Sequence, residues 1–258
     1  MNQYDTYKNT KYSFETFKIN THYNGILEHV DETIGNQYLT LIINEFVDTQ
    51  IIQINDVINF AKINDTFGSP NICFFNLVNF GINFYCSPSS LRYIYHALVI
   101  LQHYKNTGLI KLVEVGCGYG GLFLAINYFS KLLGIVIKKY YIIDLPEILL
   151  LISQYLTKNS NNIIIHYELI SAETFGTNIN DNQLFFISNY CFTEINETLR
   201  NNYIQSLFPK VSGGFITWQT CATPLDLINE LPIPINQIIV EKPQTNNFSH
   251  KKNYFVYL

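Results

Sequence analysis

The chain has 258 residues, of which 48% are hydrophobic and 15% aromatic, and its formal net charge is −4. This length suffices for one large α/β domain or a compact domain with a helical appendage, and the composition excludes a disordered chain. The acidic balance, without a run of Lys or Arg, counts against nucleic acid as a partner, and no apolar run is long enough to span a bilayer.

The five cysteines do not form a CxxC pair, which favours free thiols in a reducing compartment. The start of the sequence, MNQYDTYKNTKY, is polar and lacks the apolar core of a signal peptide. We therefore expect a cytoplasmic protein.

The chain divides near residue 108 into a mainly helical segment, 1–107, and a second domain, 108–258. In Tyr23–Phe46 apolar residues recur every three or four positions, which is typical of a helix, and Gly35 is predicted to break it into two. Ser87-Pro88 reads as an N-cap followed by proline at the first helical position, so a helix is expected from there to about Tyr104.

Beyond residue 108 short apolar runs alternate with helical patterns, which predicts βαβ units and a parallel sheet. The last two runs are separated only by a turn-like stretch, so the final strand should be antiparallel. The expected helices are Gly121–Leu133, Pro146–Lys158 and Thr193–Leu207, and the expected strands are Lys111–Gly116, Lys139–Asp144, Asn162–His166, Gln183–Ser188, Gly214–Gln219, Gln237–Glu241 and Asn253–Tyr257.

The stretch VEVGCGYGG joins the first of these strands to its helix. Glycines let the backbone turn tightly and approach a ligand, and the helix that follows offers free N–H groups and the positive end of its dipole. Gly116, Gly118 and Gly121 satisfy G-x-G-x-x-G, the dinucleotide fingerprint. A glycine-rich turn that merely connects strand and helix is the alternative.

Three features favour S-adenosylmethionine as the cofactor. Glu114 precedes the glycines as in the pattern E/D-x-G-x-G-x-G, and its carboxylate is expected to organise the loop or reach the ligand's ammonium group. Asp144 ends the second strand, where an acidic residue accepts hydrogen bonds from ribose, although it is also a candidate N-cap. An antiparallel last strand fits class I methyltransferases. The expected cofactor-binding residues are Glu114, Gly116, Cys117, Gly118, Tyr119, Gly121, Asp144, Leu145, Asn189 and Tyr190.

The segments VEVGCGYGG, YYIIDLPE and SNYCFTE resemble successive motifs of the sugar O-methyltransferase family, and INDTFGSPN and SPSSLRY resemble its segments before the glycine loop. The resemblance extends over roughly residues 60–220. It implies an α/β fold with a Rossmann-like class I methyltransferase sheet, seven strands with the last antiparallel, behind an N-terminal mainly helical segment. It also implies S-adenosylmethionine as cofactor and a sugar hydroxyl, in a glycan or nucleotide-sugar, as acceptor.

The methyl acceptor is expected at the end of the fourth strand, which continues as SNYCFTE without the (N/D)PP(Y/F) motif of many amino methyltransferases. Asn189 and Tyr190 are candidates to contact cofactor or acceptor. Glu194 is the first candidate for the general base, because a sugar hydroxyl is a poor nucleophile at neutral pH. Its alternative role is a carboxylate in the first turn of a helix.

Upstream segments supply further candidates for the acceptor site. His96 and Asp65 are the other candidate bases, and Arg92 and Tyr93 are candidates for binding the acceptor. A surface or core histidine and a turn aspartate are the alternatives. Tyr119 is expected to pack on the cofactor or to fill core.

A metal-independent reaction is expected, because neither the fourth nor the fifth strand ends in a pair of carboxylates, which hard cations prefer. A homo-oligomer is possible. Three other functions stay open: methyl transfer to a non-sugar hydroxyl, a nicotinamide-dependent oxidoreductase that uses the same glycines, and a scaffold without activity.

Overall fold

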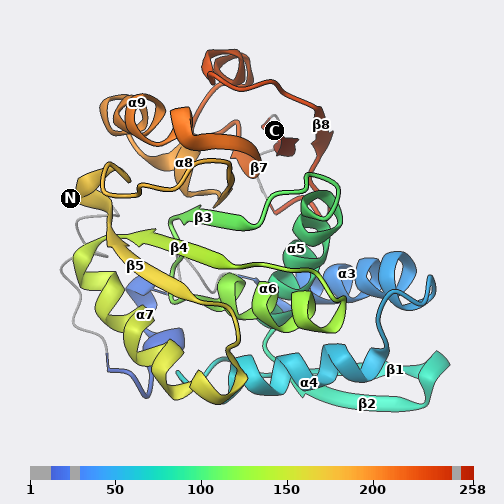
Figure 1. Ribbon diagram of the computed structural model, residues 1–258. Coiled ribbons are helices and arrows are strands. Elements are labelled where there is room, and N and C mark those ends of the chain that lie inside the picture. The colour runs from blue at the N-terminus through green and yellow to red at the C-terminus, as the bar shows by residue number, and fades with distance from the viewer. Residues whose placement is uncertain (1–12, 24–29, 246–250) are drawn as a thin grey trace. The chain divides into compact units, whose positions relative to one another are not determined.

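Apolar runs beyond residue 108 form the strands of one large sheet. The computed structural model, shown in Figure 1, describes residues 13–23, 30–245 and 251–258. Within these residues the sheet has seven strands in the order β5-β4-β3-β6-β7-β9-β8. Its strands are β3 (Lys111–Val115), β4 (Lys139–Asp144), β5 (Tyr167–Ser171), β6 (Leu184–Asn189), β7 (Val211–Gln219), β8 (Gln237–Val240) and β9 (Asn253–Tyr257).

Strand β9 runs antiparallel to both of its neighbours, β7 and β8, whereas β3, β4, β5, β6 and β7 pair in parallel. The α/β class, the Rossmann-like seven-stranded sheet and the antiparallel last strand are therefore confirmed. The stretch between β8 and β9 contains no described helix, and such a short connection joins antiparallel strands.

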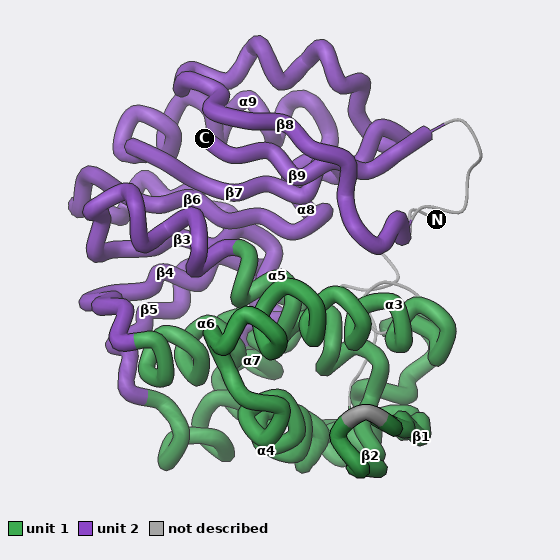
Figure 2. The backbone as a smooth tube through the Cα atoms, turned by 90° about the vertical axis from the view of Figure 1, so that its right-hand side faces the viewer, with its two compact units in different colours: residues 1–99, 118–133, 150–163 green, residues 100–117, 134–149, 164–258 purple. Residues whose placement is uncertain are grey.

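The described residues fall into two compact units, coloured in Figure 2. Unit 1 takes its residues from 1–99, 118–133 and 150–163, and unit 2 from 100–117, 134–149 and 164–258. The large sheet belongs to unit 2. The glycine loop passes from one unit to the other after Cys117. The domain boundary expected near residue 108 stays a prediction.

Unit 1 is mainly helical and also contains a β-hairpin. The described helices of the chain are α3 (Glu32–Ile42), α4 (Ile54–Asp65), α5 (Pro88–Tyr104), α6 (Gly121–Leu132), α7 (Pro146–Lys158), α8 (Cys191–Glu194) and α9 (Glu197–Ser206). Within unit 1, α4 packs against α6, where the rings of Phe60 and Phe129 lie 5.6 Å apart. The predicted helices at Pro88, Gly121 and Pro146 are confirmed.

In unit 2 one face of the sheet buries an apolar core. Val115 of β3 and Ile143 of β4 belong to it together with Phe192 of α8 and Tyr203 of α9. The opposite face packs against the last turn of α5, where Tyr104 meets Phe185 of β6 with ring centroids 5.2 Å apart. Central parallel strands buried on both faces explain the continuous apolar runs of the sequence.

Gly35 does not interrupt a helix, contrary to the prediction. Helix α3 runs through this glycine, and an added Cβ would lie 2.9 Å from Cβ of Pro88 and 3.2 Å from the ring of Phe75. The glycine thus serves close packing within unit 1. Residues 24–29 of the expected first helix lie outside the described residues.

The mainly helical interpretation of the N-terminal segment did not include β1 (Cys73–Leu77) and β2 (Ile82–Cys86). These strands form an antiparallel hairpin in which Phe75 and Phe84 are paired and buried. The side chains that alternate with the buried ones along each strand face solvent, among them Phe74 and Tyr85. An apolar residue on the exposed face hides the alternation that normally reveals a strand.

The third strand of the sheet is Tyr167–Ser171, not Asn162–His166. It is the edge strand next to β4, and Ile170 is its one buried residue. The apolar run that attracted the prediction lies outside the sheet, with Ile165 buried but Ile164 60% exposed. An edge strand buries less and gives a weaker apolar signal than a central one.

The single helix predicted over Thr193–Leu207 is two helices, α8 and α9. The backbone is extended at Ile195, and the side chain of Asn196 accepts the N–H of Leu199 as the N-cap of α9. Glu194 is therefore the last residue of a short helix rather than part of the first turn of a long one.

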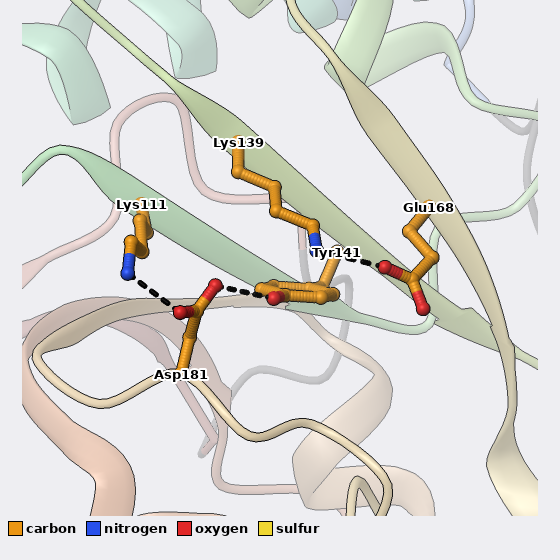
Figure 3. Close-up of polar contacts among 5 residues, drawn as sticks. All are labelled: Lys111, Lys139, Tyr141, Glu168 and Asp181. Carbon is orange, nitrogen blue, oxygen red and sulfur yellow. Dashed lines mark hydrogen bonds and ion pairs between the residues drawn. The ribbon is translucent and has the colours of Figure 1, made fainter.

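A polar network, drawn in Figure 3, joins residues near the starts of the parallel strands in unit 2. Lys111 donates to Asp181 Oδ1 at 2.6 Å, and the hydroxyl of Tyr141 donates to Oδ2. These hydrogen bonds, that from Lys111 first, lower the pKa of Asp181. Lys139 pairs with Glu168 at 2.9 Å. The network braces the sheet at the end opposite to the glycine loop.

No helix among the described residues is both long enough and apolar enough to cross a membrane.

Candidate cofactor-binding site

The glycine loop begins where β3 ends. The N–H of Gly116 donates to the carbonyl of Ile143 at 3.0 Å, so the loop starts beside the end of β4. Gly116, Gly118 and Gly120 have φ values of 80°, 59° and 92°, which favour glycine over other residues. This alternation follows the spacing E-x-G-x-G-x-G after Glu114 rather than G-x-G-x-x-G.

Asp144 lies at the end of β4 in unit 2 and is 8% exposed. Its Oδ2 accepts the backbone N–H of Cys117 at 2.7 Å, and its Oδ1 accepts that of Leu145 at 2.8 Å. The structure thus brings together three residues that the sequence assigned to the cofactor.

Glu114 is 1% exposed on β3, and its carboxylate accepts the hydroxyl of Tyr140 at 2.7 Å. Burial raises the pKa of Glu114 to about 8, the hydrogen bond from Tyr140 opposes this, and the charge of Asp144 adds to it. The sulfur of Cys117 lies 3.3 Å from the Glu114 carbonyl oxygen. Glu114 therefore sits beneath the loop rather than on its surface.

The space that Gly116 leaves open is taken by Cys191, the first residue of α8. A Cβ on Gly116 would lie 2.2 Å from Cβ and 2.4 Å from Sγ of Cys191. Ser188 of β6 strengthens the same junction, because its hydroxyl donates to the carbonyl of Val115 at 2.8 Å. The ends of β3 and β6 are thus locked together.

Asn189 and Tyr190 lie half-buried at the end of β6. The hydroxyl of Thr217 donates to Asn189 Oδ1 at 2.9 Å. Tyr190 has φ 67° and ψ −40°, an unfavourable backbone for a residue with a side chain, and its hydroxyl donates to Oε1 of the buried Glu241. Strained residues of this kind gather at functional sites, but they also need surroundings that hold them, as Glu241 does here.

Glu194 ends α8 in unit 2 and is exposed. An exposed carboxylate at this place remains accessible to a small-molecule hydroxyl. Burial is the main cause that raises the pKa of the Cys191 thiol, and the negative charges of Asp144 and Glu194 raise it further. Glu194 therefore lies near the group of residues formed by Gly116 and Cys191.

The remaining candidates lie in unit 1. Tyr119 of the glycine loop is fully buried, and its ring meets that of Tyr93 edge-on at 5.6 Å. A Cβ on Gly121 would lie 2.8 Å from the Tyr93 ring. Of the two roles foreseen for Tyr119, packing on the cofactor or filling core, its environment in unit 1 matches the second.

Asp65 is held by the start of α5 in unit 1. Its Oδ2 accepts the N–H of Ser87 at 2.7 Å, and its Oδ1 accepts the hydroxyls of Ser87 and Ser90 at 2.7 and 2.8 Å. A carboxylate at a helix N-terminus is stabilised by the helix dipole. These contacts give Asp65 a structural part in joining α4 to α5, and its role as a base stays a prediction.

Arg92 and His96 are buried on α5, with 4% and 1% exposure. The ring of His96 lies near Tyr38, with Nε2 3.5 Å from the tyrosine hydroxyl. Burial, and then the positive charge of Arg92, lower the pKa of His96 to about 3. Such an imidazole is neutral at physiological pH and weakly basic, which favours the core histidine over the catalytic one.

Tyr140, Cys191 and Glu241 were not predicted from the sequence as parts of the site. Each meets a predicted residue, namely Glu114, Gly116 and Tyr190, through the sheet or a loop far along the chain. The pairing of β3 with β4 places Leu112 opposite Tyr140, and this register, which the sequence does not show, brings Tyr140 to Glu114.

The described residues contain no group of three or more His, Cys, Asp or Glu side chains placed to hold a metal ion. Metal independence stays a prediction.

The sequence matches no family model and no curated protein. Solved structures with a similar fold include the methyltransferase domain of bacterial CtHen1-CN, with 9% identity, TM-score 0.48, and 63% of this chain and 96% of that one covered. A SAM-dependent methyltransferase from Aquifex aeolicus is 17% identical, with TM-score 0.44 and coverage of 60% and 86%. An rRNA methylase from Streptococcus thermophilus is 15% identical, with TM-score 0.39 and coverage of 64% and 90%. Likenesses at this level do not identify the cofactor or acceptor of this chain.

Proposed function

We propose that this chain is an S-adenosylmethionine-dependent methyltransferase that acts on a sugar hydroxyl, in a glycan or a nucleotide-sugar. The assignment of the cofactor is supported by the geometry at the junction of β3 and β4. There, glycines with positive φ alternate after Glu114, and Asp144 accepts the N–H of the loop residue Cys117. Ligands of doubly wound sheets bind outside the carboxyl ends of the strands, which is where this junction lies.

The residues at the junction fit the groups of this cofactor. Ribose hydroxyls need an acceptor, and Asp144 stands at the end of β4, where an acidic residue accepts them in dinucleotide-binding folds. Glu114 holds the loop from below through β3. A nicotinamide cofactor would use the same glycines, but its domain is usually all-parallel, whereas β9 is antiparallel here.

When bound, S-adenosylmethionine supplies a methyl group on a sulfonium centre that an oxygen nucleophile attacks in line. The protein's contribution is to hold the hydroxyl in place and to take its proton. Of the three candidate bases, Glu194 is the one whose carboxylate is exposed at the end of α8. Asn189 and Tyr190, at the end of β6, are the neighbours we assign to cofactor or acceptor.

The sugar as acceptor rests on the resemblance of INDTFGSPN, SPSSLRY and YYIIDLPE to segments of the sugar O-methyltransferase family. In this proposal Arg92 and Tyr93 of SPSSLRY orient the acceptor. Both side chains are buried in unit 1.

The test is a methyl-transfer assay with S-adenosylmethionine carrying a deuterated methyl group. Nucleotide-sugars and glycans form one panel, and an rRNA fragment, a lipid-linked alcohol and a small phenol form the other. Label found on a sugar oxygen supports the proposal. Label found only on compounds of the second panel would contradict the sugar as acceptor but would still support S-adenosylmethionine as the cofactor. Activity that survives EDTA is expected, and activity restored only by Mg²⁺ would show that a metal takes part.

A further inference from the structure

Tyr119 lies in the glycine loop, but its side chain belongs to an aromatic cluster of unit 1. Its ring centroid is 5.0 Å from that of Tyr155 and 5.2 Å from that of Phe17. Phe17 comes from a short 3₁₀ helix, Phe17–Ile19, near the start of the chain. A residue far upstream therefore packs directly on the loop.

Lys18, the neighbour of Phe17, is buried to 1% exposure. Its Nζ donates to the carbonyl of Asn64 at 2.5 Å and lies 4.6 Å from the centroid of the Tyr119 ring. An ammonium group is expensive to bury unless it is hydrogen-bonded, and an aromatic face attracts it further. The position of Lys18 is thus fixed by the same residues that it contacts.

Asn64, the acceptor of Lys18, also holds Tyr119 by its side chain. Its Nδ2 lies 3.1 Å from the Tyr119 hydroxyl, and its Oδ1 accepts the hydroxyl of Tyr155 at 2.8 Å. Asn64 is fully buried at the end of α4. Lys18 therefore binds the backbone of Asn64, and the side chain of Asn64 binds Tyr119 of the loop.

Residues 15–18 contact the turn after α4 through further hydrogen bonds. The N–H of Lys18 donates to the carbonyl of Gly68 at 3.0 Å, and the hydroxyl of Ser69 donates to the carbonyl of Glu15 at 2.7 Å. Gly68 has φ 86°, and a Cβ on it would lie 2.6 Å from the Phe17 ring. This close packing leaves residues 15–18 little freedom to move relative to Gly68.

We infer that Lys18 is a positioning residue for the glycine loop, acting through Asn64 and Tyr119, and that cofactor affinity depends on it. The inference rests on the proposed function in that the loop is taken to bind S-adenosylmethionine. Tyr119 stands between Gly118 and Gly120, and glycines do not restrict their own backbone. The contacts of Tyr119 with Asn64 and Tyr155 therefore restrict the backbone between these two glycines.

The test compares Lys18→Met with Lys210→Met. Methionine keeps most of the apolar stem and removes the charge and the donor. Lys210 is the matched control, because its Nζ also donates to backbone carbonyls, of Gly176 at 2.9 Å and Ile179 at 2.6 Å, but within unit 2 and away from the loop. Tyr119→Phe, which loses only the hydroxyl, is the second variant if Lys18→Met does not fold.

Two measurements separate the inference from the proposed function. Hydrogen exchange of the amides of residues 118–121, without ligand, should be about tenfold faster in Lys18→Met and Tyr119→Phe and unchanged in Lys210→Met. Calorimetry should show S-adenosylhomocysteine bound about tenfold more weakly by the first two variants alone.

Unchanged exchange in the loop of both variants would overturn the positioning role, whatever the affinities. Faster exchange in a protein that does not bind S-adenosylhomocysteine even as wild type would contradict the proposed function and support the positioning of the loop by Lys18.

Discussion

The backbone N–H of Cys117 donates a 2.7 Å hydrogen bond to Oδ2 of Asp144, which ties the glycine loop to the end of β4. Asp144 therefore has two tasks in the proposed site. It shapes the loop through Cys117, and we assign its carboxylate to the ribose of the cofactor.

Asp144→Ala should weaken S-adenosylhomocysteine binding about 10- to 150-fold, since a hydrogen bond to a charged group contributes roughly 1.5–3 kcal/mol. Asp144→Asn, which keeps one acceptor oxygen, should lose less. Calorimetry on both variants, with unfolding measured alongside to verify the fold, checks the order. Wild-type affinity in Asp144→Ala would show that Asp144 does not bind the ribose.

Gly116→Ala tests the close packing of β3 against α8. An alanine at φ 80° is strained, and its Cβ would overlap Cys191. We expect a loss of roughly 2–4 kcal/mol in the free energy of unfolding, of which about 1–2 kcal/mol is backbone strain.

In a Cys191→Gly background the overlap with the Cys191 side chain disappears, and the cost of Gly116→Ala should fall to that of the strain alone. Chemical denaturation of the four proteins of this double-mutant cycle gives the coupling. Equal costs in both backgrounds would mean that the loop relaxes away from Cys191.

The strands at the centre of the sheet could be predicted because they are buried on both faces. Lys139–Asp144 was placed correctly, and so was the helix Pro146–Lys158, whose proline marks its start. The edge strand Tyr167–Ser171 was missed because it buries little, and the hairpin of β1 and β2 because Phe74 and Tyr85 are apolar yet exposed.

The candidate site divides in a similar way. Gly116 and Asp144 were recognisable because their residue types follow from local backbone and strand-end chemistry. Tyr140 and Cys191 were not, because nothing in the local sequence says that a tyrosine will meet Glu114 or that a cysteine will fill the space beside Gly116. Such pairs are set by strand register and loop packing, which a single sequence does not reveal.

Glu114 predicts a dependence of stability on pH. Burial raises its pKa from the ordinary 4.5 to about 8, so between these values the folded protein holds a proton that the unfolded chain lacks. The contribution of this group to stability is complete below pH 4.5 and is lost as the pH rises towards 8.

Glu114→Gln is uncharged throughout, so its free energy of unfolding relative to wild type should rise steadily across that window. Urea titrations at several pH values measure the difference. Tyr140→Phe, which removes the donor that opposes the shift, should extend the loss of stability to higher pH. A difference between Glu114→Gln and wild type that does not change with pH would show that Glu114 is ionised in the folded protein.

Glu194→Gln tests the proposed base. Turnover on the acceptor should fall roughly 10²- to 10⁴-fold, as for loss of a general base, while affinity for S-adenosylhomocysteine stays the same. Glu197→Gln is the control, since Glu197 is also exposed and begins the next helix. Near-normal turnover in Glu194→Gln would mean that proximity alone drives the reaction or that another group takes the proton.

The central claim, that the junction of β3 and β4 binds S-adenosylmethionine, is tested most directly by calorimetric titration of the wild-type protein with S-adenosylhomocysteine and, separately, with NAD⁺. We predict one saturable site for S-adenosylhomocysteine and none for NAD⁺. Binding of NAD⁺ alone, or of neither ligand, would contradict the assignment.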